Sequence, residues 1–72
     1  MLAEMADTKD KVRRLRRGKA WTQGELAESA GVGQSTVAQI ESGVRPNPHP
    51  RTLGKLAKAL DVKPGDLLPD ED

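Results

Sequence analysis

The sequence has no cysteine, tyrosine or phenylalanine, and Trp21 is its single aromatic residue. Without cysteine it has no disulfide, thiol nucleophile or cysteine-ligated zinc, which fits a reducing cytosol. It also lacks an apolar run near the ~20 residues that a membrane span requires, and it lacks a signal-peptide core. At 72 residues the chain can form one small domain, but a large catalytic cleft with a cofactor is nearly excluded by size.

Charge is almost balanced in total but is unevenly distributed. Twelve basic and 11 acidic residues give a net charge of +1. Residues 9–19 carry seven bases and one acid, whereas residues 61–72 carry five acids and one base. Such asymmetry points weakly to a polyanionic partner, and solvated helix faces with an acidic tail are the alternative.

Apolar residues follow helical spacing throughout, and no stretch alternates as a half-buried strand does. Thr22 and Glu25 form a capping box that starts one helix, and Gly31 ends it because glycine enters the left-handed region without steric cost. The first helix is capped by Thr8 or Asp7. The sequence predicts an all-α fold with five helices, at about 8–17, 23–30, 34–42, 50–60 and 64–68. They form one domain at 8–68, between a flexible N-terminus at 1–7 and an acidic tail at 69–72.

The second and third helices match the geometry of a helix-turn-helix. Two short helices that cross steeply need a small inward residue on the first, which is Ala27, and a glycine in the turn, which is Gly31. The second of the pair needs branched inward residues, which are Val37 and Ile40. A helical bundle with one short loop is the alternative.

The segment WTQGELAESAGVGQSTVAQIESG (21–43) resembles the helix-turn-helix core of the Cro/C1-type, or XRE, phage-repressor family, and the resemblance spans roughly residues 12–68. It implies a compact five-helix lambda-repressor-like DNA-binding domain. The implied function is a sequence-specific transcriptional regulator of double-stranded DNA, a repressor rather than an activator. Two copies would bind a palindromic operator, with the third helix in the major groove.

The outer face of the third helix is polar and uncharged, and no Lys or Arg lies between residues 20 and 44. A helix that bound only phosphates would be basic, whereas amides and hydroxyls suit hydrogen bonding to base edges, with glutamine pairing to adenine. A solvated helix face is the alternative. With the resemblance, the base-reading candidates are Gln34, Ser35, Gln39 and Thr36.

Other positions take roles from the resemblance. Gln23 would hold Gln34 for a bidentate contact and touch the DNA backbone itself, where the start of a helix favours phosphate. Ser42, Arg45 and Arg51 would position the protein on phosphates, with solvated surface residues as the alternative.

Arg16 and Glu41 match a family pair that forms a partly buried salt bridge. Trp21 is expected to pack in the core, and His49 to cap a helix or lie on the surface. Leu67 and Leu68 are dimer-interface candidates, unless they belong to the core.

Three glycines depart from the family pattern. Gly24 and Gly54 lie within predicted helices, where glycine is expected to lower stability by ~1 kcal/mol against alanine. Gly33 lacks the hydroxyl that would cap the third helix.

Two other functions stay open. An antitoxin that binds both DNA and a toxin belongs to the same class, whereas a protein-interaction module that keeps the fold without binding DNA belongs to another. An enzyme is not expected, because one histidine and scattered carboxylates supply no catalytic pair. No metal site, cofactor, small-molecule ligand or membrane partner is predicted, and the predicted partners are operator DNA and a second copy of the chain.

Overall fold

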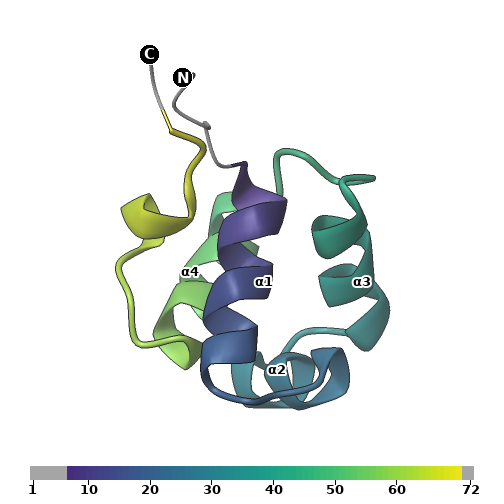
Figure 1. The fold of residues 1–72 in the computed structure, drawn as a ribbon. Helices are drawn as coiled ribbons and strands as arrows, with labels where there is room; N and C mark the ends of the chain where they lie inside the picture. The colour runs from purple at the N-terminus through teal and green to yellow at the C-terminus, as the bar shows by residue number, and fades with distance from the viewer. Residues whose placement is uncertain (1–6, 71–72) are drawn as a thin grey trace, which may run out of the picture.

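The computed structural model describes residues 7–70. In this range the chain forms four α-helices and one 3-10 helix (Figure 1): α1 (Thr8–Gly18), α2 (Gln23–Ala30), α3 (Gln34–Ser42), α4 (Pro50–Ala59) and η1 (Pro64–Leu67). The all-α prediction is therefore confirmed, but the predicted fifth helix is a single 3-10 turn. Most of the N-terminus that was expected to be flexible lies outside the described residues, as do residues 71–72, and Asp7 directly precedes α1.

Two helix starts carry the caps that the sequence predicts. The Thr22 hydroxyl accepts from the Glu25 N–H at 3.1 Å, and the Thr22 N–H donates to Glu25 Oε1 at 2.8 Å, which completes the capping box. At α4, His49 Nδ1 accepts from the Arg51 N–H at 3.1 Å, so the histidine is a helix cap. Pro50 follows at the first helical position, where no N–H is needed.

The other two α-helices begin without a side-chain cap. Asp7 occupies the cap position of α1, but neither it nor Thr8 serves as the expected side-chain cap, since Thr8 already lies in the helix. Gly33 precedes α3 and has no side chain to offer.

Glycines end α2 and α3 in the left-handed region. Gly31 has a φ of 72° and Gly43 a φ of 86°, where a side chain would be strained. Only Val32 and Gly33 lie between Gly31 and α3, so α2 and α3 form a helix-turn-helix.

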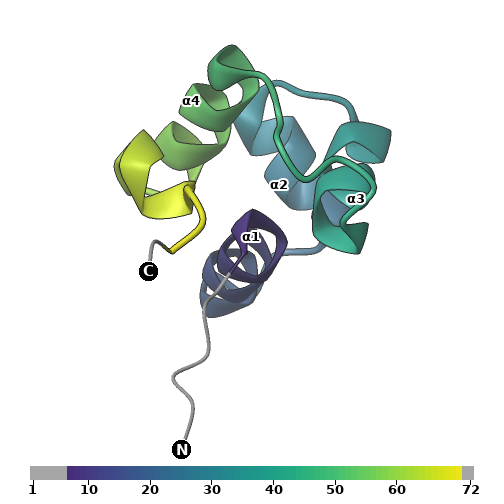
Figure 2. The ribbon, with the colours of Figure 1, turned by 90° about the horizontal axis from the view of Figure 1, so that it is seen from above.

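The core lies between the helices, and every helix contributes to it. α1 packs against α3 and η1, while α2 packs against α3 and α4. In the view from above, α1 lies below α2 in the picture, with α3 to the right and α4 at the upper left (Figure 2). The buried apolar residues are Val12, Leu26, Ala27, Val37, Ile40, Leu53, Leu56, Ala57, Leu60 and Leu67. Trp21 is half-buried and packs against this cluster rather than inside it.

Leu67 and Leu68 differ in their burial. Leu67 is fully buried and Leu68 is 49% exposed. Leu67 is therefore a core residue, which was the alternative that the sequence left open, and it has no exposed surface to offer a second copy. Burial of its side chain contributes to holding the short η1 turn on the domain.

Candidate nucleic-acid interface

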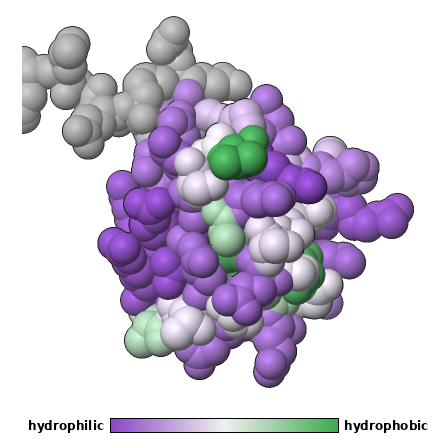
Figure 3. Space-filling model, turned by 90° about the vertical axis from the view of Figure 1, so that its right-hand side faces the viewer, coloured by the Kyte–Doolittle hydropathy of each residue, from purple (hydrophilic) through white to green (hydrophobic). Residues whose placement is uncertain are grey.

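α3 lies at one edge of the molecule (Figure 1), and the surface on that side is largely hydrophilic with a few apolar patches (Figure 3). Gln34 and Ser35 are exposed at its start, whereas Thr36 and Gln39 are half-buried. Val37 and Ile40 are fully buried on the opposite side. The structure thus brings the four base-reading candidates onto one helix, and none of them carries a charge.

Ser42 has a structural task at the end of α3. Its hydroxyl donates to the Gln39 carbonyl at 3.1 Å and accepts from the Val44 N–H at 3.4 Å. These bonds shape the turn into the loop before α4. The side chain is exposed, so a phosphate contact would have to share this hydroxyl.

Gln23 faces a different partner from the one expected. Its amide nitrogen donates to Glu41 Oε1 at 3.2 Å. Gln34 instead lies against the first turn of α2, where a Cβ added to Gly24 would be 3.3 Å from Gln34 Oε1. The predicted steering of Gln34 by the amide nitrogen of Gln23 is therefore not what the structure records.

Arg16 and Glu41 form a bidentate pair that joins α1 to α3. Arg16 Nε lies 2.7 Å from Glu41 Oε2, and Arg16 Nη2 lies 2.9 Å from Oε1. The side chains are 12% and 1% exposed, so the pair is largely removed from solvent. Arg16 also donates to the Trp21 carbonyl at 2.7 Å, which ties the α1–α2 connection to the same site.

The Glu41 carboxylate is held in its charged form. Burial acts to raise the pKa of Glu41, but hydrogen bonds from Arg16 and Gln23 and the charges of Arg16 and Arg13 outweigh it and lower that pKa. The hydrogen bond to Glu41 correspondingly raises the pKa of Arg16. Within residues 7–70 no buried side-chain nitrogen or oxygen lacks a partner.

Two further α1 bases, Lys9 and Arg13, lie near the C-terminus of α3. The sequence analysis did not predict this placement. α3 has no basic residue in its last turn. Arg13 Nη2 donates to the Glu41 carbonyl at 2.7 Å, and a Cβ on Gly43 would lie 3.6 Å from Lys9 Nζ. Cations near the last carbonyls of a helix are favourable, so α1 supplies the charge that α3 lacks. The signal in the sequence was the repeat of bases four residues apart.

The ends of α1 are also tied down by lysines. Lys11 Nζ donates to the Leu68 carbonyl at 2.7 Å and to Asp70 Oδ1 at 2.6 Å. Lys19 Nζ pairs with Asp61 at 2.8 Å and lies 5.2 Å from the centroid of the Trp21 ring. Most bases of residues 9–19 thus hold the fold together, while Arg14 and Arg17 are exposed.

Arg45 and Arg51 lie on either side of the proline-rich loop, and both side chains are exposed. The Arg45 N–H donates to the Gln39 carbonyl at 3.2 Å, which keeps the loop close to the end of α3. Val44 beside it is 71% exposed. Arg45 is the third residue after α3, and Arg51 is the second residue of α4.

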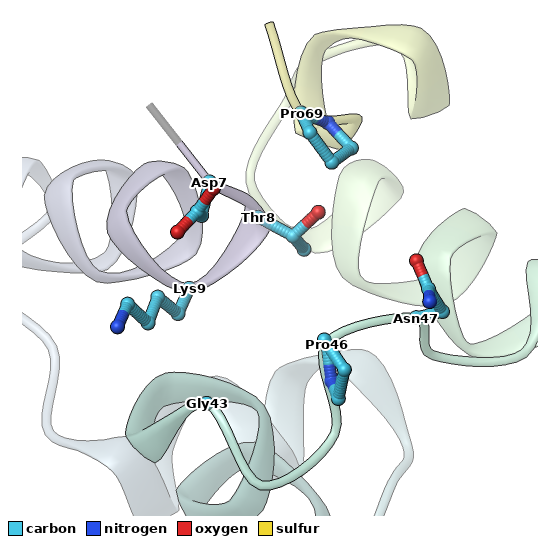
Figure 4. A pocket seen from close by; sticks show the side chains of 7 residues that line it. All are labelled: Asp7, Thr8, Lys9, Gly43, Pro46, Asn47 and Pro69. Carbon is cyan, nitrogen blue, oxygen red and sulfur yellow. The ribbon is translucent and has the colours of Figure 1, made fainter. Parts of the chain in front are cut away.

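A pocket of about 200 Å³ lies where the start of α1 meets the loop after α3 and Pro69 (Figure 4). Thr8, Lys9 and Asn47 line it with prolines and Gly43.

Within residues 7–70 no cluster of three or more His, Asp or Glu side chains could hold a metal ion. In the same range no helix combines the length and apolar character that crossing a bilayer demands.

A helix-turn-helix family model matches residues 12–67, which is most of the chain. The chain belongs to the Cro/C1-type (XRE) helix-turn-helix family. It is 36% identical over 62 residues to the transcriptional regulator SinR of Bacillus licheniformis, covering 86% of this chain and 56% of that protein. It spans about half the length of the curated relatives it matches.

Solved structures agree with this assignment. The restriction-modification controller protein C.AhdI of Aeromonas hydrophila has a TM-score of 0.79 and 36% identity, covering 85% of this chain and 91% of that one. SinR in complex with DNA has a TM-score of 0.80 and 33% identity, covering 83% and 95%. These relatives are regulators rather than enzymes, and the chain has the lambda-repressor-like helix-turn-helix fold of SinR and C.AhdI.

Proposed function

We propose that this protein is a sequence-specific, double-stranded DNA-binding transcriptional regulator that places α3 in the major groove. The observation that carries the proposal is the polar, uncharged outer face of α3 within a helix-turn-helix. Gln34 and Ser35 are exposed at the end of α3 that would enter the groove, and amides read adenine through N6 and N7. The similarity to SinR, which is solved in complex with DNA, supports this assignment.

The phosphate contacts are assigned to the surroundings of α3. Arg45 is exposed three residues after α3, Arg51 is exposed at the start of α4, and Ser42 at the end of α3 offers its hydroxyl. Gln23 begins α2, where the free N–H groups favour an anion. Such contacts set the position of the protein on the duplex, while α3 sets the sequence.

The finer proposal is a repressor that acts as a dimer on a palindromic operator in a bacterial or phage-infected cytoplasm, at the nucleoid. The two half-sites would lie about one helical turn apart, ~34 Å. Of the two leucines expected at the interface, Leu68 alone keeps exposed area, and it lies beside η1. Repression would follow from blocking polymerase at the operator.

Selection from a random duplex library with the purified chain tests this function. We expect a palindromic consensus, with log K falling steeply against log salt concentration. Equal recovery of all sequences would rule out specific binding. Sedimentation of the complex on the selected duplex then counts the bound copies, and one copy on a full palindrome would exclude the dimer.

Two variants separate reading from positioning. Gln34→Ala should relax the consensus at one position per half-site, by about 1–3 kcal/mol of discrimination. Arg45→Ala should weaken all sequences alike and make the salt slope shallower by about 1 per bound copy. The opposite pattern, uniform loss with Gln34→Ala and changed sequence with Arg45→Ala, would reverse these assignments.

A further inference from the structure

The first turn of α2 lies against the side chain that begins α3. Gly24 is the second residue of α2, and Gln34 is the first residue of α3. A Cβ added to Gly24 would lie 3.3 Å from Gln34 Oε1, 3.5 Å from Cδ and 3.8 Å from Nε2. The whole amide group of Gln34 therefore faces the bare Cα of Gly24, and its oxygen is closer than an ordinary Cβ contact allows.

The backbone does not require glycine at this position. Gly24 has ordinary helical geometry, unlike Gly31 and Gly43, which have positive φ angles. Glycine in a helix is also less favourable than alanine. Gly54 in α4 has nothing within 4 Å of an added Cβ, so the close approach to Gln34 distinguishes Gly24 from the other helix-interior glycine.

The neighbouring glutamine of α2, Gln23, has its amide nitrogen directed to another helix residue. The amide nitrogen of Gln23 donates to Glu41. The Gln34 amide lies against Gly24, one residue further along α2.

We propose that Gly24 is a specificity-determining residue. Because Gly24 has no Cβ, the Gln34 amide has room to lie against the first turn of α2, and this sets the direction in which the amide meets a base pair. The inference rests on the proposed function, since its ligand is a base edge in the major groove, with adenine preferred by an amide. A side chain at position 24 displaces the Gln34 amide and changes the base preference where Gln34 reads.

Gly24→Ala tests the inference, with Gly54→Ala as its matched control. Both variants exchange glycine for alanine in an α-helix, so we expect the melting temperature to rise by a few degrees in each. In duplex selection, Gly54→Ala should return the wild-type consensus. Gly24→Ala should lower the preference at the Gln34 position roughly tenfold and leave the other positions unchanged.

A second measurement examines the contact without DNA. The side-chain amide resonances of Gln34, assigned by their loss in Gln34→Ala, should shift in Gly24→Ala and stay in place in Gly54→Ala. Unchanged base preference in Gly24→Ala overturns the inference whether or not these resonances shift. Failure of the proposed function is distinguishable, because the wild-type chain itself would then enrich no sequence.

Discussion

Glu41 connects three parts of the fold through one carboxylate. It receives hydrogen bonds from Arg16 on α1 and Gln23 on α2, and it lies on α3 with its side chain 1% exposed. A buried carboxylate is costly unless its charge is paired and its lone pairs are occupied. Here both conditions are met, so the relative placement of α2 and α3 depends on this residue.

Removing the Arg16 side chain should lower the stability of the fold. Arg16→Ala leaves Glu41 buried without its main partner, and we expect the free energy of unfolding to fall by ~3–5 kcal/mol. Urea denaturation measures the loss. Arg14→Ala on the exposed side of the same helix is the control and should change stability by no more than about 0.5 kcal/mol. Equal stability of the two variants would remove the Arg16–Glu41 pair from this account.

Stability should also depend on pH through Glu41. Its pKa in the folded state is lowered, so its stabilising contribution is complete above the unfolded-state pKa of about 4.3 and is lost as pH falls through the folded-state pKa. Urea denaturation between neutral pH and acid measures this slope. Glu41→Gln should be less stable at neutral pH and should lose less on acidification. Parallel pH profiles for both proteins would contradict this.

Sequence reasoning reached this site only in part. The pairing of Arg16 with Glu41 was predicted from the family resemblance. Gln23 was instead expected to contact Gln34 and DNA, and no role was predicted for Arg13. Side chains 18 and 28 residues distant from Glu41 meet it only after the helices pack. No local spacing encodes such contacts, so the diversion of Gln23 from Gln34 could not be foreseen.

Element ends were the most predictable part of the fold because their signals are local. The Thr22–Glu25 capping box and the left-handed Gly31 both lie where the sequence places them. The last element was mispredicted because four residues that include a proline and a glycine cannot sustain an α-helix. Burial of Leu67 decides its position, and burial depends on the whole fold.

The same substitution should have opposite effects at two glycines. Gly54 lies inside α4 with open space around it, so Gly54→Ala should stabilise the protein by about 0.5–1 kcal/mol. Gly31 also has open space but a φ of 72°, so Gly31→Ala should destabilise it by about 1 kcal/mol or more. Thermal melts of the two variants provide the comparison. Changes of the same sign would show that backbone conformation is not what selects glycine at 31.

Leu67 and Leu68 should likewise respond differently. Leu67→Ala opens a cavity under η1 and should cost about 2–5 kcal/mol, while Leu68→Ala at the surface should change monomer stability by about 0.5 kcal/mol or less. Chemical denaturation at low protein concentration separates the two. A large loss for Leu68→Ala under those conditions would place it in the core.

For the whole molecule, the net charge is close to neutral, but the basic residues fall into groups with different roles. Arg13 and Arg16 bind Glu41 on α3, and Lys9 lies near Gly43 at the end of that helix. Lys11 and Lys19 form ion pairs with residues distant in the sequence. The basic first segment is therefore mainly structural, and its charge is weaker evidence for DNA than the sequence alone indicates. The exposed cations outside that segment are Arg45, Arg51, Lys55, Lys58 and Lys63. Specificity then depends on the uncharged face of α3.

The ratio of two dissociation constants tests that claim most directly. Both are measured for the wild-type chain at one salt concentration, on the selected operator and on a scrambled duplex of equal length. We expect the operator to bind at least ~10³-fold more tightly, as specific DNA-binding proteins do. A ratio near one would contradict the account, because α3 would then carry no sequence information.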